Sequence, residues 1–201
     1  MKVILFDFDG VIADTFSFCH RIINSRDLID EDEYRARFEG NINVTSKAKI
    51  SSKKDDKPFD FFGPYTSALL NCAPNDGLAD VIKSLSKRYT LIIISSTISP
   101  AISQFLELHH LREYFTEILG NDIEKSKVKK IQRVLEQYKI SSDETILITD
   151  TLGDIREATQ CDVRCIAVAW GYHSLETLQK GSPYKIVSRP KEILEAIESL
   201  P

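Results

Sequence analysis

The chain has 201 residues, of which 42% are hydrophobic and 28% charged, and its formal net charge at pH 7 is −4. This length and composition support one sizeable core, or a core with a small appended lobe. The slight acidity argues against a dedicated nucleic-acid-binding protein, which usually carries a basic excess. No apolar run reaches the roughly 20 residues that a membrane-spanning helix needs.

Targeting signals and cysteines point to a soluble, cytoplasmic protein. The N-terminal apolar run is broken at Asp7, so it does not resemble the core of a signal peptide. The four cysteines form no CxxC pair and have no zinc-like spacing, which favours free thiols in a reducing compartment.

Short, continuous apolar runs alternate with amphipathic stretches along most of the chain. Such runs are typical of strands buried on both faces, and the stretches between them show helical spacing. In the helix expected at 99–111, Ser99 should be the N-cap and Pro100 should occupy the first position. The alternation predicts an α/β fold with a doubly wound parallel sheet. The expected strands are 2–6, 90–94, 145–149, 165–169 and 184–187, and the expected helices are 76–89, 99–111, 126–138, 154–160 and 191–200.

The segment 16–75 does not fit this alternation, because it separates the first two expected strands and contains no comparable apolar run. It is far longer than the ~2–6 residues of an ordinary strand–helix connection. We therefore expect a smaller inserted α-helical cap domain at 16–75, with residues 1–15 and 76–201 forming the α/β core. Its polar stretch at 45–58 is rich in Ser, Lys and Asp, which is typical of a mobile loop.

Polar residues follow three of the expected strands. Asp7 and Asp9 end the first, Ser95 and Ser96 end the second, and Asp150 ends the third. Ligands of open α/β sheets bind at the carboxyl ends of strands, so these groups are expected to meet in one crevice.

Two further residues belong to the same expected crevice. Asp154 lies four residues after Asp150, and Lys125 begins the loop before the helix expected at 126–138. Several carboxylates in one crevice repel each other unless a cation lies among them. Oxygen ligands favour Mg²⁺, and a metal ion with a lysine and a serine hydroxyl suits a phosphoryl group.

Each residue taken singly also has a purely structural interpretation. Asp9-Gly10 is a common turn signal, and Asp150 or Asp154 could cap a helix. Lys125 belongs to a basic run that could be a solvated helix face. The order of these residues, each at the end of a strand, favours the functional interpretation.

Together these residues resemble the haloacid dehalogenase (HAD) superfamily of phosphatases. The DxDGx(V/T) motif is present as Asp7 to Val11, the serine or threonine of the second motif as Ser95, and the lysine as Lys125, with Lys127 as the second choice. The GDxxxD motif is present as 149–154, with Thr149 in place of the usual glycine. The chain after Trp170 also resembles phosphoglycolate-phosphatase-like members. This implies a Rossmann-like HAD core with a cap inserted after the first strand.

The resemblance implies hydrolysis of a small phosphorylated metabolite through an aspartyl-phosphate. Asp7 would be the nucleophile, and Asp9 would act as general acid and base. Mg²⁺ would be held by Asp7, Asp150 and the main-chain carbonyl of Asp9. Asp154 would be a further ligand or the partner of the lysine. The phosphoryl oxygens would be bound by Ser95, Ser96 and Lys125.

Three alternatives accompany this interpretation. A phosphosugar mutase shares the aspartate pair and differs in the cap. A receiver-like phospho-acceptor module uses similar groups, but it lacks an insert after the first strand and its acyl-phosphate persists. A non-catalytic binding protein is disfavoured by the four intact motifs. Substrate-contacting candidates in the insert are Arg35, Arg37 and the aromatic stretch 59–65, and the turn 170–173 could border the crevice; each could equally be structural.

Overall fold

The structure is a computed structural model, and it describes residues 1–41 and 59–200. Its centre is a parallel six-stranded sheet with the strand order β3-β2-β1-β4-β5-β6. The strands are β1 (Val3–Phe6), β2 (Thr90–Ile94), β3 (Glu117–Leu119), β4 (Thr145–Thr149), β5 (Arg164–Val168) and β6 (Lys185–Val187).

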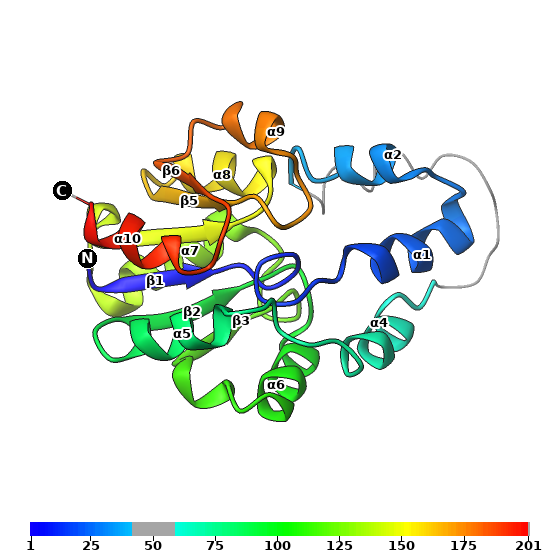
Figure 1. The fold of residues 1–201 in the computed structure, drawn as a ribbon, viewed down its shortest axis with the longest axis horizontal. Helices are drawn as coiled ribbons and strands as arrows, with labels where there is room; N and C mark the ends of the chain where they lie inside the picture. Colours follow the sequence, from blue (N-terminus) through cyan, green and yellow to red (C-terminus); the bar gives the residue numbers. More distant parts are fainter. Residues whose placement is uncertain (42–58, 201) are drawn as a thin grey trace.

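Helices cover both faces of the sheet, and others lie beyond the carboxyl ends of its strands (Figure 1). The α-helices are α1 (Phe16–Asp27), α2 (Glu31–Ala36), α4 (Phe62–Leu69), α5 (Leu78–Ser86), α6 (Ser99–Leu108), α7 (Lys127–Tyr138), α8 (Leu152–Thr159), α9 (Leu175–Gln179) and α10 (Glu192–Glu198). Short 3₁₀ turns lie at Arg112–Tyr114 and Ser142–Glu144.

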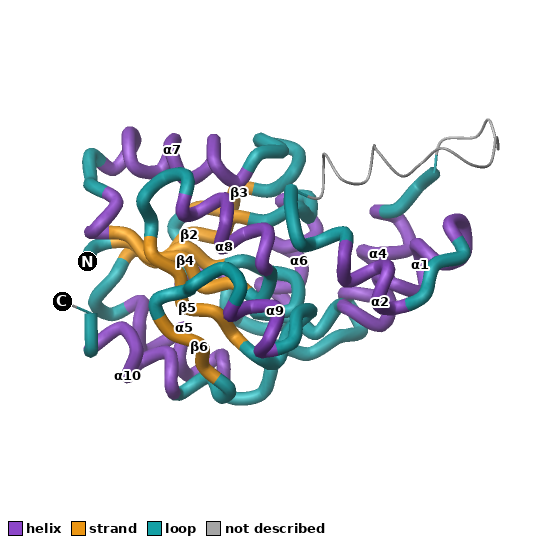
Figure 2. Tube along the Cα trace, turned by 90° about the horizontal axis from the view of Figure 1, so that it is seen from above, coloured by secondary structure: helices purple, strands orange, loops and turns teal. Residues whose placement is uncertain are grey.

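The central strand shows why its sequence is a continuous apolar run. Val3 and Leu5 pack into the cluster under α7 and α8, whereas Ile4 and Phe6 pack into the cluster under α5, α6 and α10. Figure 2 shows α7 and α10 on opposite sides of the strands. Both faces of β1 are therefore buried, so no position on the strand can be polar until Asp7.

The doubly wound α/β prediction is confirmed, and all five expected strands are present. Two short elements, β3 and α9, were not predicted. The N-cap prediction for Ser99 is wrong. Ile98 is the N-cap of α6, and Ser99 is instead a helix residue whose hydroxyl donates to Asp122 Oδ1 at 2.9 Å.

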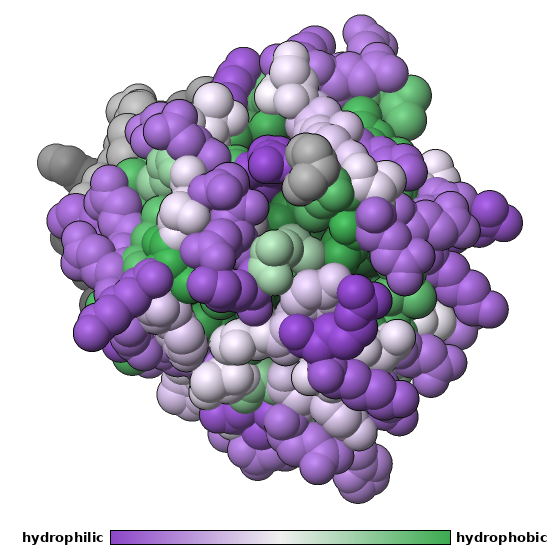
Figure 3. Space-filling view, turned by 90° about the vertical axis from the view of Figure 1, so that its left-hand side faces the viewer, coloured by the Kyte–Doolittle hydropathy of each residue, from purple (hydrophilic) through white to green (hydrophobic). Residues whose placement is uncertain are grey.

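The described part of the insert consists of α1, α2 and α4, which lie together beyond the carboxyl ends of the strands (Figures 1 and 2). We call these three helices the lobe. That 16–75 forms a separate cap domain stays a prediction, and the polar stretch 45–58 lies outside the described residues. The opposite end of the molecule is covered mostly by hydrophilic side chains, with apolar groups visible between them (Figure 3).

The segment that follows α2 is joined to α8 of the core by hydrogen bonds. The N–H of Gly153 donates to the carbonyl of Phe38 at 2.9 Å, and Arg156 Nη1 donates to the carbonyl of Glu39 at 2.6 Å. A Cβ on Gly153 would lie 2.7 Å from that Phe38 oxygen, so glycine permits this close approach. These contacts hold the lobe over the end of the sheet.

Candidate active site

Asp7 lies directly after β1, where the chain leaves the sheet. Its N–H still donates to the carbonyl of Ile148 in β4 at 2.9 Å, so the strand geometry fixes its side chain at the carboxyl edge. Asp7 Oδ1 accepts from the N–H of Phe8 at 2.8 Å, and Oδ2 lies 2.7 Å from Lys127 Nζ. Burial raises the pKa of Asp7 well above its usual value, although the Lys127 ammonium opposes this rise. The carboxylate needs a neighbouring cation to be ionised here.

Lys127 supplies part of that positive charge. Its Nζ lies 2.5 Å from Asp154 Oδ2, and the same oxygen accepts from the hydroxyl of Thr149 at 2.7 Å. Burial opposes the ionisation of Asp154, but the ammonium and the hydroxyl outweigh it and keep its pKa below the usual value. Burial also disfavours the charge on Lys127, but Asp154 and Asp7 raise its pKa, so the lysine is protonated. Asp154 therefore orients Lys127 against Asp7.

The geometry favours Lys127 over Lys125, the lysine first chosen from the sequence. α7 begins at Lys127 with Ser126 as its N-cap, and a side chain in a first helical turn points back toward the helix N-terminus. This direction carries Lys127 into the crevice. Lys125 precedes the helix; it is exposed and lines the same cavity.

Asp150 follows β4 and is completely buried. Its Oδ2 accepts from the N–H of Tyr172 at 2.6 Å, whereas Oδ1 is buried and has no hydrogen-bond partner among the described residues. Burial raises the pKa of Asp150 to about 7 despite the hydrogen bond from Tyr172. A Cβ on Gly10 would lie 2.0 Å from Asp150 Oδ2, and a Cβ on Gly171 would lie 2.3 Å from it. Two glycines thus make room for this carboxylate, one oxygen of which is unsatisfied.

Asp9 lies between the core and the lobe. Thr97 Oγ1 donates to its Oδ2 at 2.8 Å, and the Tyr65 hydroxyl donates to its Oδ1 at 2.6 Å. Ser95 Oγ is farther away, at 3.5 Å from Oδ2. The left-handed backbone of Gly10, with φ of +74°, turns the chain immediately after Asp9. The hydrogen bonds from Tyr65 and Thr97 show that the carboxylate lies between the lobe and the loop after β2.

A second buried lysine, Lys130, bonds to the main chain of the loop after β2. Lys130 is inaccessible to solvent, and its Nζ donates to the carbonyl of Ser95 at 2.5 Å. Burial and the nearby Lys127 ammonium lower the pKa of Lys130 to about 8. Ser95 Oγ accepts from the N–H of Thr97 at 3.0 Å, which shapes the loop that carries Ser96 and Thr97 into the cavity.

Several of these groups line a cavity of about 370 Å³ between the core and the lobe, but the fully buried Asp150, Ser95 and Lys130 do not. The core contributes Asp7, Asp9, Ser96, Lys125, Lys127 and Asp154, among others. The lobe and the segments beside it contribute aromatic rings together with other side chains such as Cys19, Ile23, Arg37 and Asn41. From the aromatic stretch, Phe61, Phe62 and Tyr65 line the cavity, and Phe61 and Tyr65 also stack on each other at 5.5 Å. The functional and structural interpretations of that stretch are therefore compatible.

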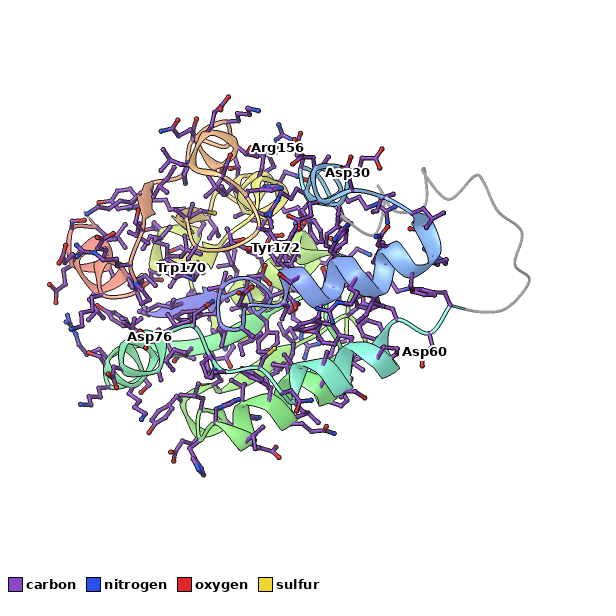
Figure 4. The ribbon with its side chains drawn as sticks, turned by 45° about the vertical axis from the view of Figure 1, so that its right-hand side comes forward. Asp30, Asp60, Asp76, Arg156, Trp170 and Tyr172 are labelled. Atoms are coloured by element: carbon purple, nitrogen blue, oxygen red, sulfur yellow. The ribbon has the colours of Figure 1, made fainter. Side chains whose placement is uncertain are left out.

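The other candidates also have defined positions. Arg37 is buried, lines the cavity and pairs with Asp27 at 2.9 Å, whereas the Arg35 guanidinium lies 3.7 Å over the Phe16 ring. Tyr172 lies in the interior where α1 leaves the core, while Asp30 and Asp60 lie on the exterior of the lobe (Figure 4). Tyr172 thus borders the crevice and positions Asp150 through its main chain.

A divalent ion fits this site, although within residues 1–41 and 59–200 no three His, Cys, Asp or Glu side chains form a ready metal cluster. Mg²⁺ typically uses only one or two carboxylates, together with waters and substrate phosphate oxygens. The unsatisfied Oδ1 of Asp150 and the carboxylate of Asp7, whose ionisation burial opposes, are donors of the required kind. No helix in the described part of the chain is long and apolar enough to cross a membrane.

Sequence reasoning missed Thr97 and Lys130 at this site, and it indicated Tyr65 only as part of the aromatic stretch 59–65, not as a partner of Asp9. Thr97 lies two residues beyond Ser95, and Tyr65 closes the aromatic stretch, but neither position indicates contact with Asp9. Lys130 had a usable signal. It lies three residues after Lys127 and one before Ile131, on the buried face of α7.

Known proteins resemble this chain in family, sequence and fold. The family model described as haloacid dehalogenase-like hydrolase matches residues 4–168. The phosphoglycolate phosphatase of Synechococcus elongatus is 24% identical over 212 residues, covering 100% of this chain and 99% of its own. The pyrophosphatase PpaX of Oceanobacillus iheyensis is 24% identical over 213 residues, covering 98% and 97%. A haloacid dehalogenase-like family hydrolase from Streptococcus pneumoniae has the same fold, with a TM-score of 0.80, 19% identity and 98% coverage of both chains.

Proposed function

Because this chain belongs to the haloacid dehalogenase-like hydrolases and is a phosphatase of that family, we propose that it cleaves phosphate monoesters of small metabolites by covalent catalysis at Asp7. The observation that carries the proposal is the position of the Asp7 carboxylate. It lies at the end of β1 on the wall of the cavity, 2.7 Å from a buried ammonium group. A carboxylate held beside a cation on the wall of a substrate-sized cavity can attack phosphorus.

In the first step an oxygen of Asp7 forms a bond to phosphorus as the ester P–O bond breaks. Asp9 donates a proton to the leaving alkoxide, which departs as an alcohol. In the second step Asp9 removes a proton from water, the water oxygen attacks phosphorus, and the bond to Asp7 breaks to release phosphate. General acid and base catalysis of this kind contributes on the order of 10²–10⁴ in rate.

Lys127 is proposed to bind the phosphoryl oxygens together with Ser95, Ser96 and Lys125. Lys127 is the best placed of these, because Asp154 already orients its ammonium toward Asp7. Ser96 and Lys125 line the cavity, whereas Ser95 is fully buried and shapes the loop. Positive charge and hydrogen-bond donors at these positions would stabilise the charge that develops on the phosphoryl group.

Mg²⁺ is the proposed cofactor. Asp7, Asp150 and the main-chain carbonyl of Asp9 would hold it, and Asp154, which is occupied by Lys127 and Thr149, is better suited to orient Lys127 than to bind the metal. When bound, the ion would neutralise the charge of the phosphoryl oxygens.

The substrate is proposed to be a small phosphorylated metabolite, whose organic part would meet the aromatic wall formed by the lobe. Relatives are named phosphoglycolate phosphatase and pyrophosphatase. The receiver-like alternative does not hold, because the chain is an enzyme of a hydrolase family. The mutase alternative stays open and differs in its product. Three further points stay predictions from the sequence: that the protein has no nucleic-acid partner, that it has no membrane partner, and that it is cytoplasmic.

The test is release of inorganic phosphate from p-nitrophenyl phosphate by purified protein with Mg²⁺. Asp7→Asn should abolish release, since an amide cannot form the acyl-phosphate, and chelation of the metal should reversibly stop turnover. Asp76→Asn is the matched control, because Asp76 is exposed and lies away from the cavity (Figure 4). Undiminished turnover in Asp7→Asn would reject the nucleophile assignment. Transfer to a second sugar-phosphate position without phosphate release would favour the mutase.

A further inference from the structure

Tyr65 reaches from the lobe to the residue assigned as general acid. It lies in α4, its side chain is inaccessible to solvent, and its hydroxyl donates to Asp9 Oδ1 at 2.6 Å. The other carboxylate oxygen accepts from Thr97 Oγ1 of the core at 2.8 Å. Ser95 Oγ of the core lies 3.5 Å from the same Oδ2. The core thus holds one oxygen of Asp9, and the lobe holds the other through Tyr65.

The position of the Tyr65 hydroxyl is fixed by packing of its ring. The ring stacks on Phe61 at 5.5 Å between centroids and packs against Phe18 of α1 at 5.6 Å. Burial raises the pKa of Tyr65 well above its usual value, with the charge of Asp9 acting in the same direction. The hydroxyl therefore keeps its proton and acts as a hydrogen-bond donor to the carboxylate.

We propose that Tyr65 is a positioning residue for Asp9, which orients the carboxyl group for proton transfer to the leaving group only when the lobe is docked. The proposal rests on the proposed function. A carboxyl group rotates freely about its last torsion unless both oxygens are held. The core donors Thr97 and Ser95 both bond to Oδ2 and leave Oδ1 unheld, whereas Tyr65 holds Oδ1 and so fixes the rotation. Tyr65 itself exchanges no proton with the substrate.

This role has a consequence that depends on the leaving group. An alkoxide needs a proton as it departs, whereas p-nitrophenolate is stable without one. Removing the Tyr65 hydroxyl should therefore slow phosphoryl transfer from an alkyl phosphate and leave transfer from p-nitrophenyl phosphate nearly unaffected. A hydrogen bond to a charged group that contributes to orientation corresponds to roughly a 10- to 100-fold loss in kcat/KM.

The experiment compares kcat/KM for glycerol phosphate and for p-nitrophenyl phosphate in wild type and Tyr65→Phe. The alkyl-to-aryl ratio should fall about tenfold or more in the variant. Asp9→Asn, which lacks the acid itself, should show a larger fall in the same ratio. In an Asp9→Asn background, Tyr65→Phe should cause no further change in the ratio. Tyr184→Phe is the control, because its hydroxyl bonds to the Ser199 carbonyl far from the cavity.

An equal loss for both substrates would overturn the proposal, because it would indicate that Tyr65 serves only packing or binding. An unchanged ratio would overturn it as well. Thermal melting checks that Tyr65→Phe is folded. If it is not, Tyr65→Met, which also lacks the hydroxyl and keeps apolar bulk, is used to measure the same alkyl-to-aryl ratio of kcat/KM. Failure of the proposed function is distinguishable, because it would show as full activity in Asp7→Asn, whereas failure of this inference leaves Asp7→Asn inactive.

Discussion

Replacing Lys127 by methionine should destabilise the fold strongly, because it leaves two buried carboxylates without their cation. The Lys127 side chain is 5% exposed, and its partners Asp7 and Asp154 are 7% and 10% exposed. Removing one member of a buried, hydrogen-bonded ion pair costs about 3–5 kcal/mol. For a chain of 201 residues, this corresponds to a fall in melting temperature of about 7–12 °C.

The effect should depend on pH in a defined direction. Lys127 has a raised pKa and Asp154 a lowered one, so their mutual stabilisation is present at neutral pH and is lost as Asp154 takes a proton. In Lys127→Met, protonation of the carboxyl groups removes the penalty. The stability gap between wild type and variant should therefore be largest near pH 7–8 and shrink toward the usual carboxyl pKa of about 4.

The assay is thermal and urea unfolding in EDTA, so that no metal ion replaces the missing charge. Lys129→Met on the exposed face of the same helix is the control, and it should change stability by no more than about 0.5 kcal/mol. Unfolding of Lys127→Met at the same temperature and urea concentration as that control at pH 7.5 would show that Lys127 does not offset the charge of the buried carboxylates.

Three further predictions concern the metal site and the second buried lysine. Gly171→Ala places a Cβ 2.3 Å from the Asp150 Oδ2 position, so the Mg²⁺ concentration for half-maximal activity should rise roughly tenfold or more; an unchanged metal titration would contradict this. Because burial raises the pKa of Asp150 to about 7, Mg²⁺ must compete with a proton below that pH. In the wild type, the Mg²⁺ concentration for half-maximal activity should therefore increase as the pH is lowered from 8 to 6. Lys130 has a pKa lowered from 10.5 to about 8, so its protonated form opposes folding. As the pH rises from 8 to 10.5, the free energy of unfolding of the wild type should increase by up to about 3 kcal/mol relative to that of Lys130→Met. Parallel plots of this free energy against pH for the two proteins would exclude this role of Lys130.

Much of the core could be predicted from the sequence because its strands are buried on both faces. Ile4 and Leu5 pack to opposite sides of the sheet, and this double burial produces the continuous apolar runs. The edge strand β3 has only three residues, two of them half-buried, so its sequence lacks such a run. The helix α9 is one short turn-like element with a single buried residue, Leu178, which is too little for a periodic pattern.

The sequence predicts the site residues that lie at the ends of strands. It does not predict the contacts that form where the lobe packs on the core. Asp7, Asp9 and Asp150 follow strands, so the parallel topology alone brings them to one edge. The choice between Lys125 and Lys127 depends on where α7 begins, and boundaries are the least certain part of a sequence-based assignment. The contact between Tyr65 and Asp9 joins residues 56 positions apart through the packing of the lobe, which no local pattern encodes.

The most direct test of the central claim is chemical trapping of the covalent intermediate. Protein turning over a phosphate monoester with Mg²⁺ is quenched in acid, reduced with borohydride and analysed by mass spectrometry of the peptide that contains residue 7. An acyl-phosphate on Asp7 is reduced to homoserine, so homoserine at position 7, and none in protein quenched without substrate, is the expected result. Intact aspartate at position 7 in protein quenched during active turnover, or homoserine at another acidic residue, would contradict nucleophilic attack by Asp7.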